Sequence, residues 1–205
     1  MNNEIQPPAW ALAGATRLNL EEFGKEFIRY WRDVRSRVLK FECWQTYQEP
    51  DTRSLHEYQH GNFDVVQSLL EGEAEFDREV YEDVKKKSIQ FIRVRLVKLP
   101  LSEYLMFEIW NYVVRSRLGE SIEIVDLSDD GRPLPNHSYF DFLLFDATAA
   151  LVHDYGTDGL QVGGWLTTSS DALKRLKAMG ERVRLESIPL DDFTAKQSIE
   201  IPPRG

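Results

Sequence analysis

The chain has 205 residues, a formal net charge of −9 and a hydrophobic share of 42%. That apolar share is too high for a disordered chain, and no apolar run approaches the roughly 18 residues of a membrane span. The single cysteine excludes an internal disulfide and a multi-cysteine zinc site. We therefore expect a soluble, cytoplasmic globular protein that neither contacts a membrane nor holds a cofactor.

The charge balance also limits the kind of partner. Asp and Glu number 34 against 25 Lys and Arg, and affinity for nucleic-acid phosphates comes mainly from clustered Lys and Arg. We therefore expect no direct binding to nucleic acid. The acidic surface is compatible with a basic protein partner.

The ends of the chain read differently from its middle. The first residues contain Pro7, Pro8 and an Ala-rich stretch, and the last contain Pro202 and Pro203. We expect a flexible leader over 1–18, one globular domain over 19–190 and a tail over 191–205.

The first half of the domain alternates helical and strand patterns. Asn19 can cap a helix whose apolar stripe includes Phe23, Phe27 and Trp31. Strands are expected over 38–47 and 89–99, where apolar residues alternate with others. Three further helices are expected, a short one from Asp51 through Tyr58, one over 63–88 broken near Gly72, and one from a Ser102 cap to Gly119.

The second half contains strands at short spacing. Residues 122–127, 139–145, 149–155 and 160–166 read as strands, and a final helix is expected from Ser170 or Asp171 to about Leu185. Short links join antiparallel neighbours. We therefore predict an α+β fold of one domain, with an antiparallel sheet of about five or six strands and helices packed mainly on one face.

Two arginines stand on one face of the predicted strand 89–99. Arg93 and Arg95 could hold a phosphate or carboxylate together. They could equally form a structural network with Glu108 or Asp141, which is the interpretation we favour.

Carboxylates near the predicted sheet are a second candidate. Asp141, Asp146, Asp154 and Asp158 could supply metal ligands for phosphodiester hydrolysis, although turn chemistry explains most such sets. Asp141 lies within an aromatic run, so it must be exposed or paired. Residues 126–137 resemble the start of a calcium loop, but His137 stands where a bidentate Glu is required.

Two histidines spell a metalloprotease pattern. His56, Glu57 and His60 give the string H-E-x-x-H, with Glu71, Glu73 and Glu75 as conceivable third ligands. Gly61 ends the helix at once, so His56 and His60 are weak metal candidates. Cys43 has no activating neighbour and is expected to be a small buried side chain.

Three segments carry a family resemblance. Residues 23–50 (FGKEFIRYWRDVRSRVLKFECWQTYQEP), 91–110 (FIRVRLVKLPLSEYLMFEIW) and the pair 140–146 and 153–159 (FDFLLFD, HDYGTDG) resemble an uncharacterised, mainly actinobacterial domain-of-unknown-function family over roughly residues 20 to 190. Genes of that family often lie beside Xre-type helix-turn-helix regulators. The resemblance singles out a polar set that forms either one site or one scaffold at a sheet–helix junction: Arg95, Tyr104, Glu108, Gly119, Glu120, Asp141, Asp146 and Asp154.

Two functions of different class remain open. The first is a non-catalytic intracellular regulatory or interaction module, partner of a helix-turn-helix regulator in a toxin–antitoxin-like pair. The second is a metal-dependent hydrolase or nuclease that uses the carboxylates at the sheet–helix junction. Ligand sensing through Arg93 and Arg95 lies between them.

Overall fold

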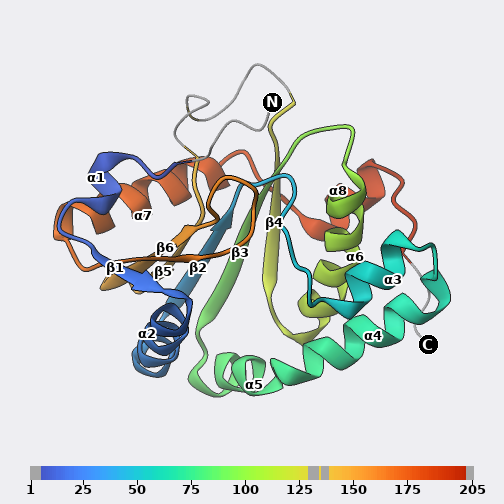
Figure 1. Cartoon of the computed structure of the whole chain (residues 1–205), viewed down its shortest axis with the longest axis horizontal. Helices are drawn as coiled ribbons and strands as arrows, with labels where there is room; N and C mark the ends of the chain where they lie inside the picture. The colour runs from blue at the N-terminus through green and yellow to red at the C-terminus, as the bar shows by residue number, and fades with distance from the viewer. Residues whose placement is uncertain (1–5, 129–133, 135–138, 202–205) are drawn as a thin grey trace.

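One mixed β-sheet runs through the molecule. The computed structural model describes residues 6–128, 134 and 139–201. Within them, eight strands pair in the order β1-β7-β6-β5-β2-β3-β4-β8 (Figure 1). The strands are β1 (Thr16–Asn19), β2 (Arg37–Glu42), β3 (Gln90–Val97), β4 (Ser121–Asp126), β5 (Phe142–Phe145), β6 (Ala149–Asp154), β7 (Gly163–Thr167) and β8 (Ile188–Pro189).

The predicted antiparallel sheet of five or six strands is wrong. β2, β3 and β4 are parallel neighbours, whereas β5, β6 and β7 are antiparallel as the short links between them required. The parallel pairs arise because long helical segments connect β2 to β3 and β3 to β4, and such crossovers return the chain in the same direction. The two remaining strands, β1 and β8, are short edge additions beside β7 and β4.

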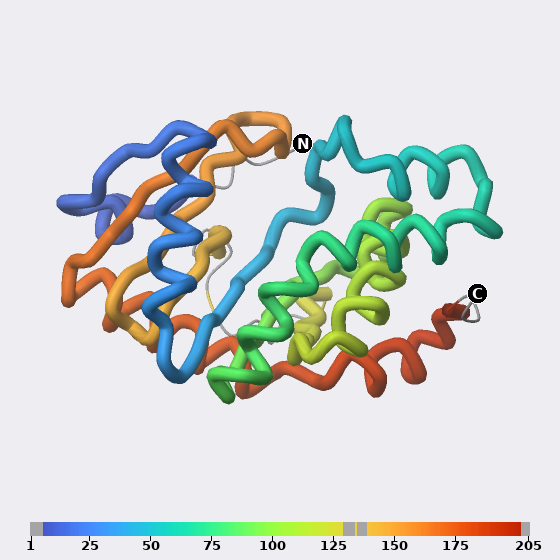
Figure 2. Tube along the Cα trace, turned by 90° about the horizontal axis from the view of Figure 1, so that it is seen from below, coloured from blue at the N-terminus to red at the C-terminus, as the bar shows by residue number. Residues whose placement is uncertain are grey.

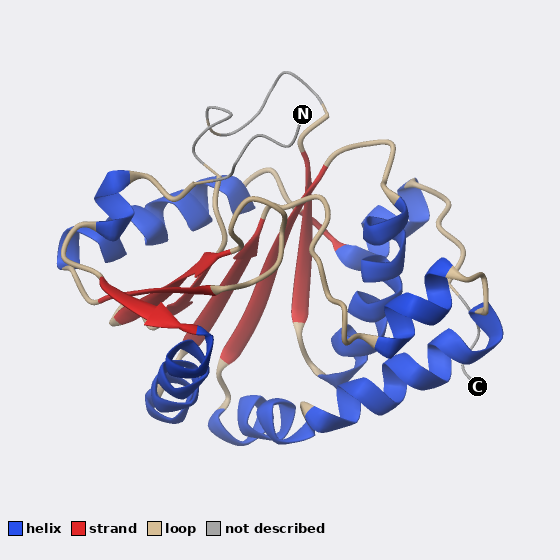
Figure 3. Cartoon of the chain, viewed as in Figure 1, coloured by secondary structure: helices blue, strands red, loops and turns tan. Residues whose placement is uncertain are grey.

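Helices cover both faces of this sheet (Figures 1 and 3). α7 and α1 lie on one face, and α2, α5 and α6 lie on the other, with α3 and α4 outside α6. The helices are α1 (Ala9–Leu12), α2 (Leu20–Asp33), α3 (Arg53–Gln59), α4 (Phe63–Phe76), α5 (Arg78–Lys87), α6 (Glu103–Leu118), α7 (Ser170–Arg184) and α8 (Leu190–Lys196).

Two of these helices begin at the capping residues that the sequence predicts. The Asn19 side chain accepts the Glu22 amide at 2.9 Å and the Glu22 carboxylate accepts the Asn19 amide at 2.9 Å, a complete capping box. α6 begins after Ser102 and ends at Gly119, which has a φ of +120°. The break expected near Gly72 is wrong, because the chain continues as helix to Phe76 and turns at Asp77.

Segments expected outside the domain add to its edges. The segment 1–18 contributes α1 and most of β1, and Ala11 is fully buried. α8 extends into the segment 191–205, where Phe193 packs beside Leu190 in a cluster with the α6 side chains. The calcium-like segment 126–137 lies largely outside the described residues.

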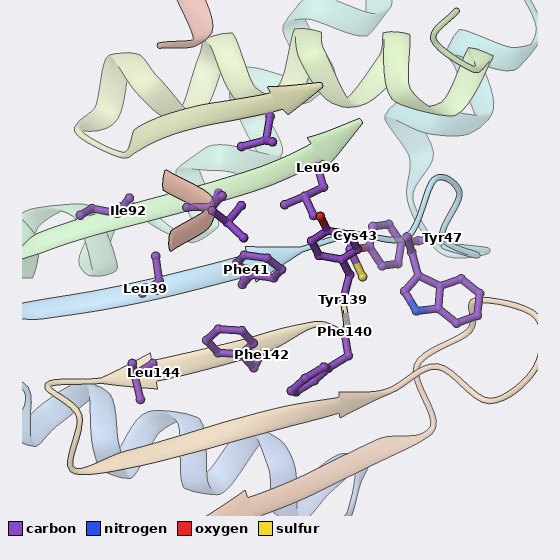
Figure 4. Close-up of a cluster of buried hydrophobic side chains, with 14 of the residues drawn as sticks. Leu39, Phe41, Cys43, Tyr47, Ile92, Leu96, Tyr139, Phe140, Phe142 and Leu144 are labelled. Atoms are coloured by element: carbon purple, nitrogen blue, oxygen red, sulfur yellow. The ribbon is translucent and has the colours of Figure 1, made fainter. Parts of the chain in front are cut away.

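The apolar core lies between the central strands and α7. Phe41 and Phe142 stack with ring centroids 5.1 Å apart, flanked by Leu39 and Leu144 (Figure 4). α7 approaches β2 so closely that a Cβ on Gly180 would lie 2.5 Å from a Leu39 methyl carbon. The opposite face of the same strands carries an apolar cluster under α2 and α5 and a group of charged side chains beside it.

Candidate functional site

Alternation along β2 and β3 places four charged side chains on one face of the sheet. The parallel register pairs Lys40 with Arg93 and Glu42 with Arg95. Side chains alternate between the faces of a strand, so Phe41 enters the core while Lys40 and Glu42 point the other way. The centre of this face is therefore charged, between the apolar contacts that α2 and α6 make with the rest of it.

Arg93 joins two buried carboxylates. Its Nη1 donates to Glu42 at 2.7 Å and its Nε donates to Glu120 at 2.7 Å, while Lys40 lies 2.8 Å from the same Glu42 oxygen. Burial opposes ionisation of Glu42, but the nearby Arg93 and Lys40 cations outweigh it, and the pKa of Glu42 lies well below its usual range. Glu42 is therefore a buried anion held by two cations.

Two tyrosines donate hydrogen bonds to the second oxygen of each carboxylate in this network. Tyr112 donates to Oε2 of Glu42 at 2.9 Å, and Tyr81 donates to Oε2 of Glu120 at 2.9 Å. Burial, followed by the neighbouring carboxylates, raises the pKa of both phenols above the ordinary value. Both tyrosines therefore stay neutral donors.

Arg95 lies beside this network without a carboxylate in ion-pair contact among the described residues. It is fully buried, and its Nη1 donates to the Tyr47 hydroxyl at 3.3 Å. Its Nε and Nη2 donate to no acceptor in the described part of the chain. Its guanidinium lies 5.1 Å from the centre of the Tyr47 ring, a cation–π contact.

Asp141 anchors the loop that follows β2. It accepts the Cys43 amide at 2.9 Å, the Cys43 thiol at 3.0 Å and the Tyr47 hydroxyl. Burial raises the pKa of Asp141, although these donors oppose the rise. Burial and the adjacent Asp141 raise the pKa of the Cys43 thiol well above its usual value, so Cys43 is a buried, protonated side chain, as the sequence predicts.

A polar pocket of about 510 Å³ opens beside these networks. In Figure 2, β2 runs between α2 on one side and α4 and α5 on the other. The lining comes from β2, the loop after it, α4, β3, α6 and the β6–β7 connection: Lys40, Glu42, Tyr47, Gln48, Glu49, Asp51, Thr52, Glu73, Asp77, Arg93, Glu108, Asn111, Arg115, His153, Tyr155, Gly159 and Gln161.

One face of α6 supplies the pocket wall. Tyr104 donates to Glu49 at 2.9 Å, and Asn111 donates to Glu108 at 3.4 Å. Arg115 donates to Asn111 at 3.0 Å and to Asp77 at 2.5 Å. These α6 residues follow helical spacing, so they share one side of the helix.

The structure brings together part of the predicted polar set. Arg93 binds Glu120, and Arg95 reaches Asp141 through Tyr47. Neither arginine forms an ion pair with Glu108 or Asp141, the partners that the sequence suggests, because Arg93 binds Glu42 and Glu120 instead. Glu108 and Tyr104 belong to the α6 wall.

Asp146 and Asp154 lie elsewhere. Asp146 accepts the amides of residues 35, 36 and 37 at 2.6–3.0 Å and ties the end of α2 to the start of β2. Asp154 pairs with Arg17 at 2.5 Å, at the edge formed by β1 and β7. Both carboxylates therefore have structural roles, because their bonds hold neighbouring segments together.

The two histidines of the H-E-x-x-H string share the exposed side of α3. The His56 and His60 rings lie 4.3 Å apart, and Nδ1 of His60 contacts the His56 carbonyl at 2.7 Å. The conceivable third ligand Glu73 instead accepts from Ser54 at 2.5 Å. Among the described residues, no three His, Cys, Asp or Glu side chains group so that they could hold a metal ion.

Several pocket residues escape sequence reasoning. Lys40 and Glu42 had a signal, because they alternate with apolar residues in β2 as Arg93 and Arg95 do in β3. Glu49 and Arg115 had none, since only the packing of the β2–α3 loop against α6 brings them to one cavity.

Comparisons with known proteins give little beyond a family. No curated protein matches the chain. A phospholipase D family member, Nuc from Salmonella typhimurium, is similar in structure at 4% identity and a TM-score of 0.42, over 81% of this chain and 89% of that chain. A TM-score this low supports no inference about fold or activity. No described helix is both long and apolar enough to cross a bilayer.

The family itself is clear. A family model described as a domain of unknown function, DUF6879, matches residues 25–195. The predicted resemblance is thereby confirmed in its coarse form, a domain of unknown function over most of the chain. Because the match spans well over half of the sequence, the chain belongs to the DUF6879 family.

Proposed function

We propose that the chain is a non-catalytic intracellular regulatory module that binds a small polar ligand in its pocket. The observation that carries this proposal is the closed network in which Lys40, Glu42 and Arg93 line the pocket and Glu120 binds Arg93 from behind. Charged groups that are fixed by one another form a preorganised polar surface, which is what ligand recognition requires.

The state of the reactive side chains supports binding rather than chemistry. Cys43 is buried and its raised pKa keeps it a thiol. Burial and the nearby Lys40 lower the pKa of His153 to about 3, so it is neutral at physiological pH and far from the range suited to a general acid or base.

The metal-dependent hydrolase or nuclease alternative has less support. Its predicted carboxylates are dispersed, since Asp141 binds Cys43 and Tyr47 while Asp146 and Asp154 hold turns at other places. A two-metal or one-metal hydrolytic site needs such oxygens around a common point.

We propose a DNA-binding regulator of the helix-turn-helix class as the protein partner. The net charge of −9, the 12% aromatic content and the family resemblance motivate this partner. An acidic protein would be attracted to the basic surface of a DNA-binding protein. The proposal places both proteins in the cytoplasm.

Size-exclusion chromatography with light scattering tests the partner. We expect the purified chain to form a complex at micromolar concentration with the helix-turn-helix regulator encoded beside it. An unrelated acidic protein of similar size is the control, because it measures attraction by charge alone. The measurement is made at 0.15 M salt, where electrostatic screening matches physiological conditions. Absence of a complex under these conditions would reject the partner.

A thermal-shift screen of small polar compounds tests the pocket. A ligand that binds only the folded state raises the unfolding temperature, and one at about 100 times its dissociation constant adds about 2.7 kcal/mol. We expect at least one compound class to do so. The shift must disappear when Asn111, which lines the pocket, is replaced by tryptophan, because the larger side chain fills the cavity without changing its charge, and it must persist when the distant Arg184 is replaced.

A further inference from the structure

In the described part of the chain, two carboxylates that line the pocket form no ion pair within 4.0 Å. Glu108 is only 5% exposed yet lines the pocket, and the one hydrogen bond that it accepts from a described residue, from Asn111, is 3.4 Å long. Among the described residues, its Oε2 accepts no hydrogen bond, and no Lys, Arg or His lies within 4.0 Å of the carboxylate. A carboxylate this buried normally has a cation or several strong donors, so Glu108 is poised for a partner from outside the chain.

Glu49 faces Glu108 from the loop after β2. Its hydrogen bonds come from neutral hydroxyls, from Tyr104 at 2.9 Å and from Thr52 at 3.3 Å. Tyr104 and Glu108 are four residues apart on α6, so the Glu49 carboxylate reaches the same side of the helix. Burial raises the pKa of Glu49, and the negative Glu108 raises it further.

The cations of the pocket are already matched with other carboxylates. Lys40 and Arg93 bind Glu42, and Arg115 binds Asp77 at 2.5 Å. Arg95 remains beyond ion-pair distance of Glu108 and uses its Nη1 on Tyr47. The charge that is left over in the cavity is therefore negative.

The wall beside the carboxylates is aromatic and uncharged. Tyr47 and Tyr155 lie with ring centroids 4.9 Å apart, and His153 is parallel to Tyr155 at 5.4 Å. Ring faces attract cations. A cavity of about 510 Å³ has the size of a small-molecule site.

We propose that the pocket binds an organic cation with a primary ammonium or guanidinium head, which donates to Glu49 and Glu108 beside the ring of Tyr155. This inference rests on the proposed function, because it names the ligand class of the same pocket. The cation is either a free small molecule or a Lys or Arg side chain of a protein partner, and the chemistry at the two carboxylates is the same.

Three probes of equal length separate charge from shape. Putrescine, 1,4-butanediol and succinate each have six chain atoms. Putrescine carries two positive charges, 1,4-butanediol is neutral and succinate carries two negative charges. Calorimetric titration at low salt should show saturable binding of putrescine and none of the other two, because low ionic strength preserves electrostatic attraction. Preference for succinate, equal binding of all three, or no binding of putrescine at millimolar concentration would overturn the inference.

Matched variants assign the binding to these carboxylates. Glu108→Gln and Glu49→Gln keep the side-chain shape and remove the charge, so each should weaken putrescine about tenfold or more, as loss of a charge-assisted hydrogen bond does. Glu103→Gln makes the same charge change on the exposed first turn of α6 and should change the affinity less than twofold. Equal affinities in Glu108→Gln and Glu103→Gln would refute the site.

Folding of the variants is measured separately. Glu108→Gln removes a buried carboxylate that has no cation, so its far-ultraviolet circular dichroism should be unchanged and its unfolding temperature equal to or above that of the parent. A large fall in unfolding temperature would mean that Glu108 is a structural anion held by Arg95, and the inference would fail. Glu49→Gln, on a half-buried loop residue, provides an independent test.

Blocked peptides identify the source of the cation. A tripeptide with a central lysine, capped at both ends, is compared with its acetyl-lysine form, in which the charge is removed. Tighter binding of the lysine peptide than of putrescine assigns the cation to a partner's side chain, and the reverse order assigns it to a free amine. If succinate alone binds, the cation is refuted while ligand binding in the pocket stands, so the two failures are distinct.

Discussion

Replacement of Arg93 by methionine removes the cation that joins Glu42 and Glu120. Methionine conserves much of the aliphatic volume, but both carboxylates stay buried, at 5% and 3% exposure, and Glu120 loses its cation. Removal of one partner from a buried ion pair costs about 3–5 kcal/mol. In a chain of this size, that loss corresponds to a fall of about 6–20 °C in unfolding temperature.

Urea denaturation followed by circular dichroism measures this loss. Arg184→Met is the matched control, because Arg184 makes two hydrogen bonds to Glu123, at 2.8 and 2.7 Å, on a partly exposed surface. An ion pair of that kind contributes about 1 kcal/mol or less. Because both arginines make two bonds to carboxylates, a larger loss of unfolding free energy in Arg93→Met than in Arg184→Met is due to burial and not to the number of bonds.

The pH dependence gives a second signature of the same substitution. In the parent, the pKa of Glu42 lies well below its usual range, so Glu42 adds stability at neutral pH that is lost as the pH falls through its folded pKa. Without Arg93, burial dominates and raises the pKa of Glu42, so the variant gains relative stability in acid. The gap between parent and variant should narrow from pH 7 toward pH 4. A loss below about 1 kcal/mol at pH 7, or a gap that widens in acid, would refute the closed network.

Three further outcomes follow from local geometry. Asp146→Ala should cost about 1–3 kcal/mol in urea denaturation at neutral pH, because three backbone amides lose their acceptor. Hydrogen bonds outweigh burial and lower the pKa of Asp146, so that cost should shrink in acid, and a pH-independent cost would contradict this role. Gly163→Ala should cost about 2 kcal/mol or more and speed hydrogen exchange in β1, since its Cβ would lie 2.3 Å from the Leu18 carbonyl oxygen, whereas Gly14→Ala meets open space and should cost less. Cys43 should react with a disulfide reagent only as the chain unfolds, and prompt labelling of native protein would contradict its burial.

The parts of the fold that the sequence predicts correctly are those decided by neighbours in the chain. Asn19, Ser102 and Gly119 mark helix ends through bonds within a few residues. β1 escapes such reasoning, because Thr16–Asn19 is a strand only through pairing with β7, almost 150 residues away. The parallel pairs were within reach, since the helical stretches before and after Gln90–Val97 are long enough for crossovers.

The candidate site divides in the same way. Arg93 and Arg95 stand out in the sequence because charges within an apolar strand need compensation. Their partners do not, because the register that sets Lys40 beside Arg93 and Glu42 beside Arg95 is a property of the assembled sheet. Glu49 depends on the path of a loop, so no local pattern indicates it.

The two faces of β2 have a consequence for how relatives of this chain can diverge. Leu39 and Phe41 touch α7 and the aromatic stack, so drift at these positions is limited by volume, and apolar residues can replace one another singly. Lys40 and Glu42, one step along the same strand, balance Arg93, so a change of sign at one requires a change at another. We expect an alignment of the family to show independent variation at Leu39 and Phe41 and paired substitution at Lys40 and Glu42. Neighbouring positions of one strand would thus vary under two different constraints, side-chain volume at one pair and charge balance at the other.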